Sequence, residues 1–274
     1  MAAIGSEVLG PVRIGGVGSA VRTLLPDALA ALAAAHPRLV PTVVGGGGGG
    51  ARARPPPPPR AGGPRPRPRP PRAPPAPAPP PPRRPPTVGA GAAAPLLPRL
   101  AGGELDLLLV ESWAPRPLTV PEGITLRTLV SEEVYVALSA HHPLADRATL
   151  DLTAPADLGE LADTAWACCP PGTEAYEALV QTLRARGIEP DIRHLLADHP
   201  TQLALVSRNL TACLAPAMSR RPAPPGVRFL PTRPALRRDI RVAWPARVQS
   251  PPVRACLSAL ATAVPGASKG EWEE

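Results

Sequence analysis

The hydrophobic pattern changes its period within the first 37 residues. Val12 and Ile14 belong to a short apolar run that ends in glycines, and glycine allows the positive φ angles of a tight turn. Apolar residues then recur at steps of three and four, at Val21, Leu24, Leu25, Ala28, Leu29 and Leu32. This pattern predicts a strand, a glycine turn and a helix that ends at His36-Pro37, with Ser19 as the helix N-cap.

This opening also predicts a binding crevice. A strand that ends in glycines at the start of a helix leaves free N–H groups and a partial positive charge, which suit an anionic or polar small molecule. Ser19 either contacts such a ligand or serves only as the helix cap. Gly16 and Gly18 match part of a dinucleotide-binding motif, but Val21 replaces the third glycine and no acidic residue closes the next strand. A nucleotide cofactor is therefore disfavoured.

Strand-like and helix-like segments alternate along the rest of the chain. The near-continuous apolar run 105–110 is typical of a parallel strand covered by helices on both faces. The other predicted strands are 39–44, 124–129, 133–140, 165–169, 192–196, 210–214, 227–230 and 240–244. The other predicted helices are 96–101, 154–163, 174–186, 200–207 and 252–264. Because the strand, glycine turn, polar cap and helix of the opening recur at 165–186, we expect two similar α/β halves.

The segment 45–95 interrupts this alternation. Of its 51 residues, 49 are Gly, Ala, Arg or Pro, so it cannot bury enough apolar area to offset its conformational entropy. The composition predicts a disordered insertion with local polyproline II, either a solvated segment or a basic arm that touches nucleic acid non-specifically. These four residue types also share GC-rich codons, so a repeat expansion or out-of-frame stretch is a further hypothesis.

Charge and cysteine usage limit the possible partners and compartment. The formal net charge is +8, but the segment 45–95 holds nine arginines and no acidic residue, and the remainder has 21 basic and 22 acidic residues. The folded part is therefore nearly neutral. We predict no membrane span and no signal peptide, and the four cysteines, Cys168, Cys169, Cys213 and Cys256, lack C-x-x-C spacing. Cys168 and Cys169 lie in an apolar strand-like run, which favours buried thiols over a disulfide or a metal pair, and a reducing cytoplasm is the simplest compartment.

No catalytic or metal-binding constellation is present in the sequence. There is no G-x-S-x-G motif, and the single lysine, Lys269, lies near the C-terminal end. His141 and His142 precede a proline in a predicted turn, and a metal site there would need further ligands. We therefore predict no enzyme activity, no metal and no cofactor. Arg237 and Arg238 are predicted to line a strand and to face water.

Six segments occur in an order that resembles a known family. They are VRIGGVGSAVRTLLPDALAALAAAHPRL, LLPRLAGGELDLLLVE, LVSEEVYVALSAHHPLAD, LTAPADLGELAD, CPPGTEAYEALVQTLRARGIEP and LALVSRNLTACLAP. Together they are similar to the effector-binding domain of LysR-type transcriptional regulators. The resemblance covers nearly everything except the N-terminal tail (1–11) and the segment 45–95, and the residues 265–274 are predicted to form a C-terminal tail.

The resemblance implies an α/β fold of two Rossmann-like subdomains joined by two crossing strands, like type 2 periplasmic binding proteins. The first subdomain would comprise 12–130 plus 238–264 and the second 131–237, with the effector between them. The effector-binding residues that it implies are Gly18, Ser19, Glu111, Trp113, Gly172, Thr173, His199 and Thr201. Trp113 would either stack on a ligand or cover the rim of the cleft.

Three departures from the family pattern are visible. The family begins with a winged helix-turn-helix, whereas eleven residues precede Val12 here, so we expect no DNA-reading helix. The insertion replaces a family loop at the mouth of the cleft, and SRNLTACLAP stands where the family has a glycine-rich turn.

The predicted function is that of a cytoplasmic, ligand-sensing domain of a LysR-type regulator that forms a homodimer or higher homo-oligomer. It would contact DNA only indirectly, or non-specifically through the arginine-rich insertion. We expect a small effector, with a carboxylate favoured by Ser19 and the start of the first helix. The alternative is a stand-alone solute-binding protein of the same fold.

Overall fold

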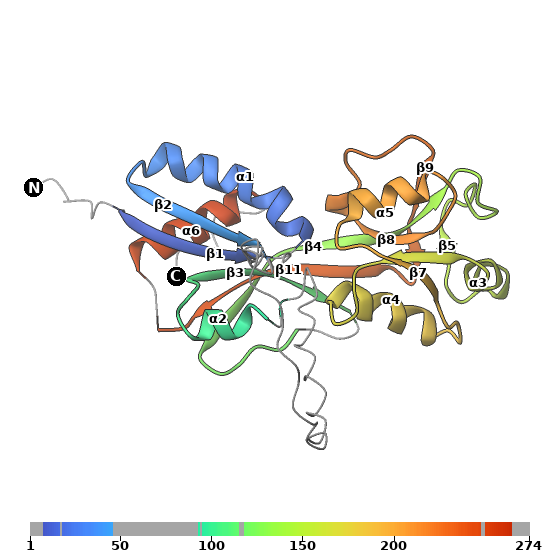
Figure 1. Ribbon diagram of the computed structural model, residues 1–274, viewed down its shortest axis with the longest axis horizontal. Helices are drawn as coiled ribbons and strands as arrows, with labels where there is room; N and C mark the ends of the chain where they lie inside the picture. The colour runs from blue at the N-terminus through green and yellow to red at the C-terminus, as the bar shows by residue number, and fades with distance from the viewer. Residues whose placement is uncertain are drawn as a thin grey trace, which may run out of the picture. The chain divides into compact units, whose positions relative to one another are not determined.

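The computed structural model describes residues 8–16, 18–45, 93, 95–114, 118–247 and 250–264 (Figure 1). The predicted C-terminal tail and nearly all of the predicted insertion lie outside the described residues. The helices are α1 (Gly18–Ala35), α2 (Leu97–Ala101), α3 (Pro155–Ala162), α4 (Glu174–Arg184), α5 (His199–Val206), α6 (Pro251–Thr262) and the 3-10 turn η1 (Ala217–Ser219).

The strands are β1 (Gly10–Gly16), β2 (Leu39–Gly45), β3 (Leu107–Trp113), β4 (Ile124–Ser139), β5 (Leu150–Asp151), β6 (Ala165–Cys168), β7 (Asp191–Leu195), β8 (Cys213–Pro216), β9 (Val227–Leu230), β10 (Thr232–Arg233) and β11 (Leu236–Pro245). β1 begins two residues before the predicted strand, and its first two residues pair with Leu39 and Val40. The order of elements agrees with the predicted alternation of strands and helices.

One mixed sheet runs through the described chain in the order β2-β1-β3-β11-β4-β8, with β9 also paired to β4. β1 is parallel to β2 and to β3, whereas β11 is antiparallel to both β3 and β4. The two smaller sheets are β10-β5 and the parallel pair β6-β7. This arrangement agrees with the α/β fold of type 2 periplasmic binding proteins that the resemblance implies.

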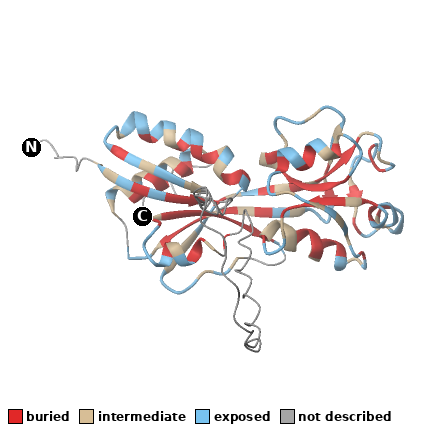
Figure 2. Cartoon of the chain, in the orientation of Figure 1, coloured by how far each residue is buried: buried red, intermediate tan, exposed pale blue. Residues whose placement is uncertain are grey.

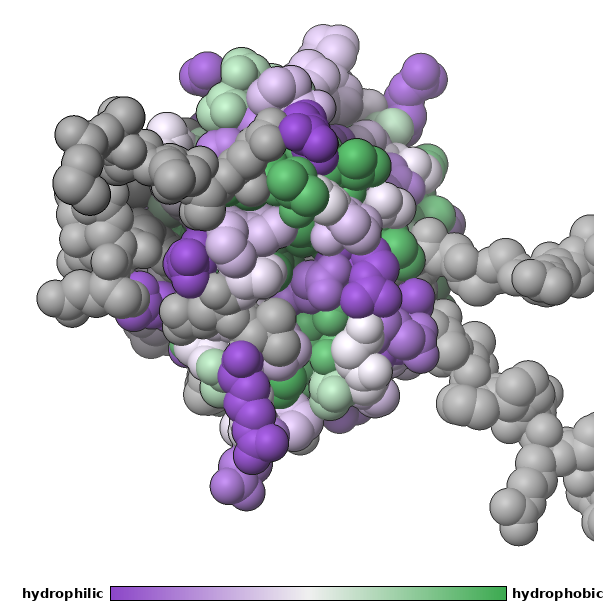
Figure 3. Space-filling view, turned by 90° about the vertical axis from the view of Figure 1, so that its left-hand side faces the viewer, coloured by the Kyte–Doolittle hydropathy of each residue, from purple (hydrophilic) through white to green (hydrophobic). Residues whose placement is uncertain are grey.

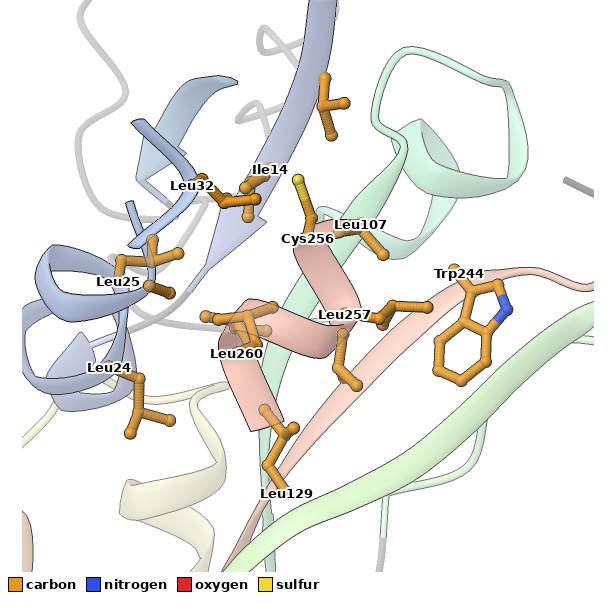
Figure 4. Packing of buried hydrophobic residues seen from close by; sticks show 14 of the residues in the cluster. Ile14, Leu24, Leu25, Leu32, Leu107, Leu129, Trp244, Cys256, Leu257 and Leu260 are labelled. Atoms are coloured by element: carbon orange, nitrogen blue, oxygen red, sulfur yellow. The ribbon is translucent and has the colours of Figure 1, made fainter. Parts of the chain in front are cut away.

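β3 is buried along its whole length because helices cover both of its faces (Figure 2). Leu107 and Leu109 belong to a core cluster with α1 and α6, whereas Leu108 and Val110 belong to a cluster with α2. Alternate residues of a strand point to opposite faces, so each set meets a different helix layer. In Figure 4 the leucines of α1 lie beside Cys256, Leu257 and Leu260 of α6.

A second large core lies around Trp166, which is fully buried, and includes residues of β4, β6, α4 and β8. Trp113 at the end of β3 belongs to this second cluster. The chain therefore has two main apolar cores, and β4 contributes to both, through Leu129 to the first and Val136 to the second.

The prediction of two strands at 124–129 and 133–140 is wrong, because β4 is continuous over both. The middle of β4 pairs with β11, with Val130 opposite Ile240, Ser131 opposite Asp239 and Glu132 opposite Arg238. A register shift between Ile240 and Arg241 accommodates the join. β4 and β11 are thus the two crossing strands.

The end of the fold that carries β2, α1 and α6 shows hydrophobic residues interspersed with hydrophilic ones on its described surface (Figure 3). Val40 and Val43 of β2, 60% and 37% exposed, are among the large apolar side chains left in solvent. No helix in the described ranges is long and apolar enough to cross a bilayer.

Candidate functional site

Arg238 lies at the centre of the structure, in β11 between the two cores. Its residue is 1% exposed, so the prediction that it faces water is wrong. Arg238, Ile240 and Val242 share one face of β11 and all three are buried. Arg237, one position earlier, is exposed as predicted.

Two carboxylates and one hydroxyl surround the Arg238 guanidinium. Its Nε donates to Oε1 of Glu132 at 2.6 Å, and Nη1 forms an ion pair with Oε1 of Glu111 at 2.8 Å. Its Nη2 donates to Oγ of Ser19 at 2.6 Å. Glu132 is fixed further because its Oε2 accepts a hydrogen bond from the Met218 N–H at 2.7 Å. Strands β3, β4 and β11 and helix α1 therefore meet at one buried charge cluster.

Ser19 lies inside the first turn of α1, because the helix begins at Gly18. The prediction that Ser19 is the N-cap is therefore wrong. Its buried hydroxyl accepts the hydrogen bond from Arg238. Gly18 has a φ of 50°, and a Cβ there would stand 3.1 Å from Oε1 of Glu111. Glycine at this position lets the Glu111 carboxylate approach the start of α1.

Glu111 and Trp113 lie two residues apart at the end of β3 and therefore on the same face of the strand. The Trp113 indole Nε1 donates to Oε2 of Glu111 at 2.9 Å, and the ring centre lies 5.5 Å from Cζ of Arg238. Trp113 is 4% exposed. The tryptophan therefore links the charge cluster to the second core.

A cavity of about 300 Å³ adjoins Trp113 on the side of α4. The described residues that line it are Trp113, Ala114, Leu118, Thr119, Gly172, Thr173, Glu174, Glu177, Ala178 and Gln181. Three of the predicted effector-binding residues, Trp113, Gly172 and Thr173, thus share one cavity. Glu174 in its wall accepts a hydrogen bond from the Ala93 N–H at 3.2 Å, and burial raises the pKa of its carboxyl.

The turn before α4 matches the predicted polar cap. Thr173 is the N-cap, its Oγ1 accepting from the Tyr176 N–H at 3.2 Å and donating to the Pro170 carbonyl at 2.8 Å. Gly172 has a φ of 85°, a conformation that favours glycine, and a Cβ there would meet nothing within 4 Å. Both residues line the cavity at the N-terminus of α4.

His199 and Thr201, predicted together, have different environments. His199 is buried, and burial followed by the positive charge of Arg238 lowers the pKa of its imidazole to about 4. Thr201 is exposed, and both its N–H and its hydroxyl donate to Asp198, the N-cap of α5. His199 is therefore close enough to feel the charges of Arg238 and Glu111, whereas the hydrogen bonds of Thr201 serve the helix cap.

Cys168 and Cys169 are free, buried thiols, as the sequence predicted, and Cys213 and Cys256 are free and buried as well. Cys169 accepts a 3.6 Å hydrogen bond from Gln202 Nε2, and burial, followed by the negative charge of Glu111, raises its pKa to about 12. A thiol with so high a pKa is a poor nucleophile at neutral pH. Within the described residues, no three His, Cys, Asp or Glu side chains gather as a metal site would require.

Sequence reasoning missed Arg238 and Glu132, which hold the cluster together. The sequence did indicate that Arg238 is buried, because it lies two and four residues before the apolar Ile240 and Val242 and so shares their face of the strand. Glu132 carried no comparable signal, because it lies in a polar stretch interpreted as a break between strands.

Curated relatives match about half of this chain. The "Small neutral protease regulatory protein" of Streptomyces coelicolor is 33% identical over 132 residues, which make up 47% of this chain and 38% of that protein. The same-named protein of Streptomyces lividans is also 33% identical over 132 residues, 47% of this chain and 36% of its own length. The chain thus spans well under half the length of the curated relatives it matches.

Solved structures share the fold. The C-terminal domain of a probable LysR family transcriptional regulator from Rhodococcus sp. RHA1 has a TM-score of 0.61 and 21% identity, over 92% of this chain and 99% of that one. The family model described as "LysR substrate binding domain" matches residues 87–265. The chain belongs to the LysR substrate-binding domain family.

Proposed function

We propose that this chain senses a small molecule held between the start of α1 and the start of α4, and that it does so for a transcriptional regulator. One observation carries the proposal: Ser19, Glu111 and Arg238 form a buried polar cluster that Trp113 joins to a cavity. Buried charges in a core are costly unless they are paired, and they concentrate at functional sites. A concave site of this volume suits a small ligand.

We propose a carboxylate as the ligand class. Arg238 is a fully buried cation, and Ser19 and the first turn of α1 lie beside it. Guanidinium groups bind carboxylates well because their N–H donors match the spacing of the two oxygens. Glu111 and Glu132 already pair with Arg238, which argues against a highly charged anion.

The subdomain boundaries, 12–130 with 238–264 and 131–237, remain part of the proposal. The two large cores support them, since one is built around α1 and α6 and the other around Trp166 and α4. On this proposal the chain acts in the cytoplasm as a homodimer or higher homo-oligomer, is not an enzyme, and affects DNA through the assembly that carries it. A stand-alone solute-binding protein of this fold is the alternative.

A ligand screen tests the proposal directly. Small aromatic and aliphatic acids, with their amides and amines as controls, are screened by the shift in melting temperature, because ligands that bind only the folded state raise it. Isothermal titration of each hit then compares the wild type with Ser19→Ala and with Ser258→Ala on the exposed side of α6. We expect Ser19→Ala alone to weaken binding about tenfold or more. An unchanged affinity would place the ligand elsewhere.

A further inference from the structure

The two carboxylates that pair with Arg238 are not held equally. Glu132 is fixed at both oxygens, by Nε of Arg238 and by the Met218 N–H. Glu111 is held at Oε2 by the Trp113 indole, while its Oε1 lies 2.8 Å from Nη1 of Arg238 as an ion pair. That contact lacks hydrogen-bond geometry, since Nη1 is a buried nitrogen without a hydrogen-bond partner in the described part of the chain. Glu111 is therefore the more replaceable partner.

Glu111 also occupies the place where a free carboxylate would be expected. Its Oε1 lies against Gly18 at the start of α1, beside the guanidinium that also binds Ser19. A carboxylate next to a helix N-terminus and a buried arginine is the arrangement that an anionic ligand would adopt. Here the protein supplies that carboxylate from β3.

We infer that Glu111 is a specificity-determining residue, a tethered carboxylate that competes with a ligand carboxylate for Nη1 of Arg238. This inference rests on the proposed cleft site. It changes the role of Glu111 from a ligand contact to a competitor of the ligand. A tethered group competes strongly because its effective concentration is set by the chain and not by diffusion.

The charges of the cluster support this role. Arg238 faces two carboxylates, Glu111 and Glu132, so a third carboxylate enters a cluster that already has more negative than positive groups. His199 does not offset this excess at neutral pH, because the lowered pKa of about 4 keeps its imidazole neutral. Loss of the Glu111 charge would leave one cation and one carboxylate, with Nη1 free for a ligand.

Two variants of the full chain test the inference with acetate, propionate and benzoate as probes. Glu111→Gln keeps an acceptor for Trp113 and removes the charge, and Glu111→Ala also removes the side-chain volume. Asp157→Asn is the matched control, because Asp157 is also buried and pairs with an arginine, Arg147, at 3.5 Å. Affinity is measured by isothermal titration. The melting temperature in each carboxylate salt is also compared with the melting temperature in the chloride salt at the same ionic strength.

We expect at least one Glu111 variant to bind one of the three carboxylates about tenfold or more tightly than the wild type, with no gain in Asp157→Asn. The neutral analogues acetamide and benzamide should show no gain. If neither Glu111→Gln nor Glu111→Ala binds any probe more tightly, the inference is wrong. If Glu111→Ala does not fold, the result for Glu111→Gln decides.

The outcomes separate this inference from the proposed function. Carboxylate binding by the wild type that is unchanged or weaker in the Glu111 variants would refute the competitor role and leave the cleft site intact. Binding that appears only in the variants would support the competitor role and refute a carboxylate as the natural ligand class. Equal gains in Asp157→Asn would show a non-specific response to lost charge and refute the inference.

Discussion

Replacing Arg238 by methionine should destabilise the fold severely. The change removes the cation between Glu111 and Glu132 and leaves both carboxylates buried without it, since they are 6% and 7% exposed. Breaking a buried ion pair by removing one partner costs about 3–5 kcal/mol. Two carboxylates share this cation, and Ser19 loses a donor as well. We therefore expect Arg238→Met to lose about 4 kcal/mol of the free energy of unfolding.

Urea unfolding followed by tryptophan fluorescence and circular dichroism measures this loss, with the midpoint and slope fitted separately. Arg237→Met is the matched control, because Arg237 precedes Arg238 in the same strand but is exposed, and a surface change of this kind alters stability by about 0.5 kcal/mol or less. The triple variant Glu111→Gln, Glu132→Gln, Arg238→Met should recover much of the loss, because the buried charges are then gone.

A loss below about 1 kcal/mol in Arg238→Met would refute the reasoning, since the carboxylates would then have to be solvated or otherwise paired. A triple variant as unstable as Arg238→Met would show that shape, and not charge, makes Arg238 necessary.

Three further predictions concern stability. The pKa of His199 is lowered from 6.5 to about 4 in the folded chain, so the unfolded chain binds a proton at this histidine first as the pH falls. The free energy of unfolding should therefore decline by up to about 3 kcal/mol between pH 6.5 and 4. Urea titrations at several pH values measure this decline, and His199→Gln should flatten it. Leu24→Ala, in the first core, should cost about 2–5 kcal/mol by urea unfolding, and a loss below 1 would contradict the packing. Asp198→Ala should cost about 1 kcal/mol by the same assay through the lost cap of α5.

The sequence predicted the order of elements because local periodicity determines it. The apolar steps in α1, the continuous apolar run in β3 and the Thr173 cap of α4 each depend on neighbours within a few residues. The family resemblance implied the two crossing strands, although residues 130–132, which include the polar Ser131 and Glu132, were interpreted as a break in β4. Pairing with β11, more than 100 residues later, keeps that segment extended.

The charge cluster could not be predicted in the same way. Ser19 and Arg238 are 219 residues apart and Glu132 and Arg238 are 106 apart, so no local pattern reports their contact. An arginine is usually exposed, which favoured the wrong interpretation of Arg238. The two-residue spacing from Arg238 to Ile240 and Val242 indicated a buried position instead, and the structure agrees with that spacing. The effector-binding roles of the predicted residues stay predictions.

The pairing of β4 with β11 limits how the two cores can move against each other. These strands pair from Ile124 opposite Pro245 to Val134 opposite Leu236, and they join the region of α1 and α6 to that of Trp166. A loop hinge can swing freely, whereas a two-stranded ladder resists bending but yields to torsion, because strand twist varies without loss of hydrogen bonds. A ligand-induced movement of one core relative to the other should therefore be a small change in the twist of the β4–β11 pair, centred near the register shift at Ile240.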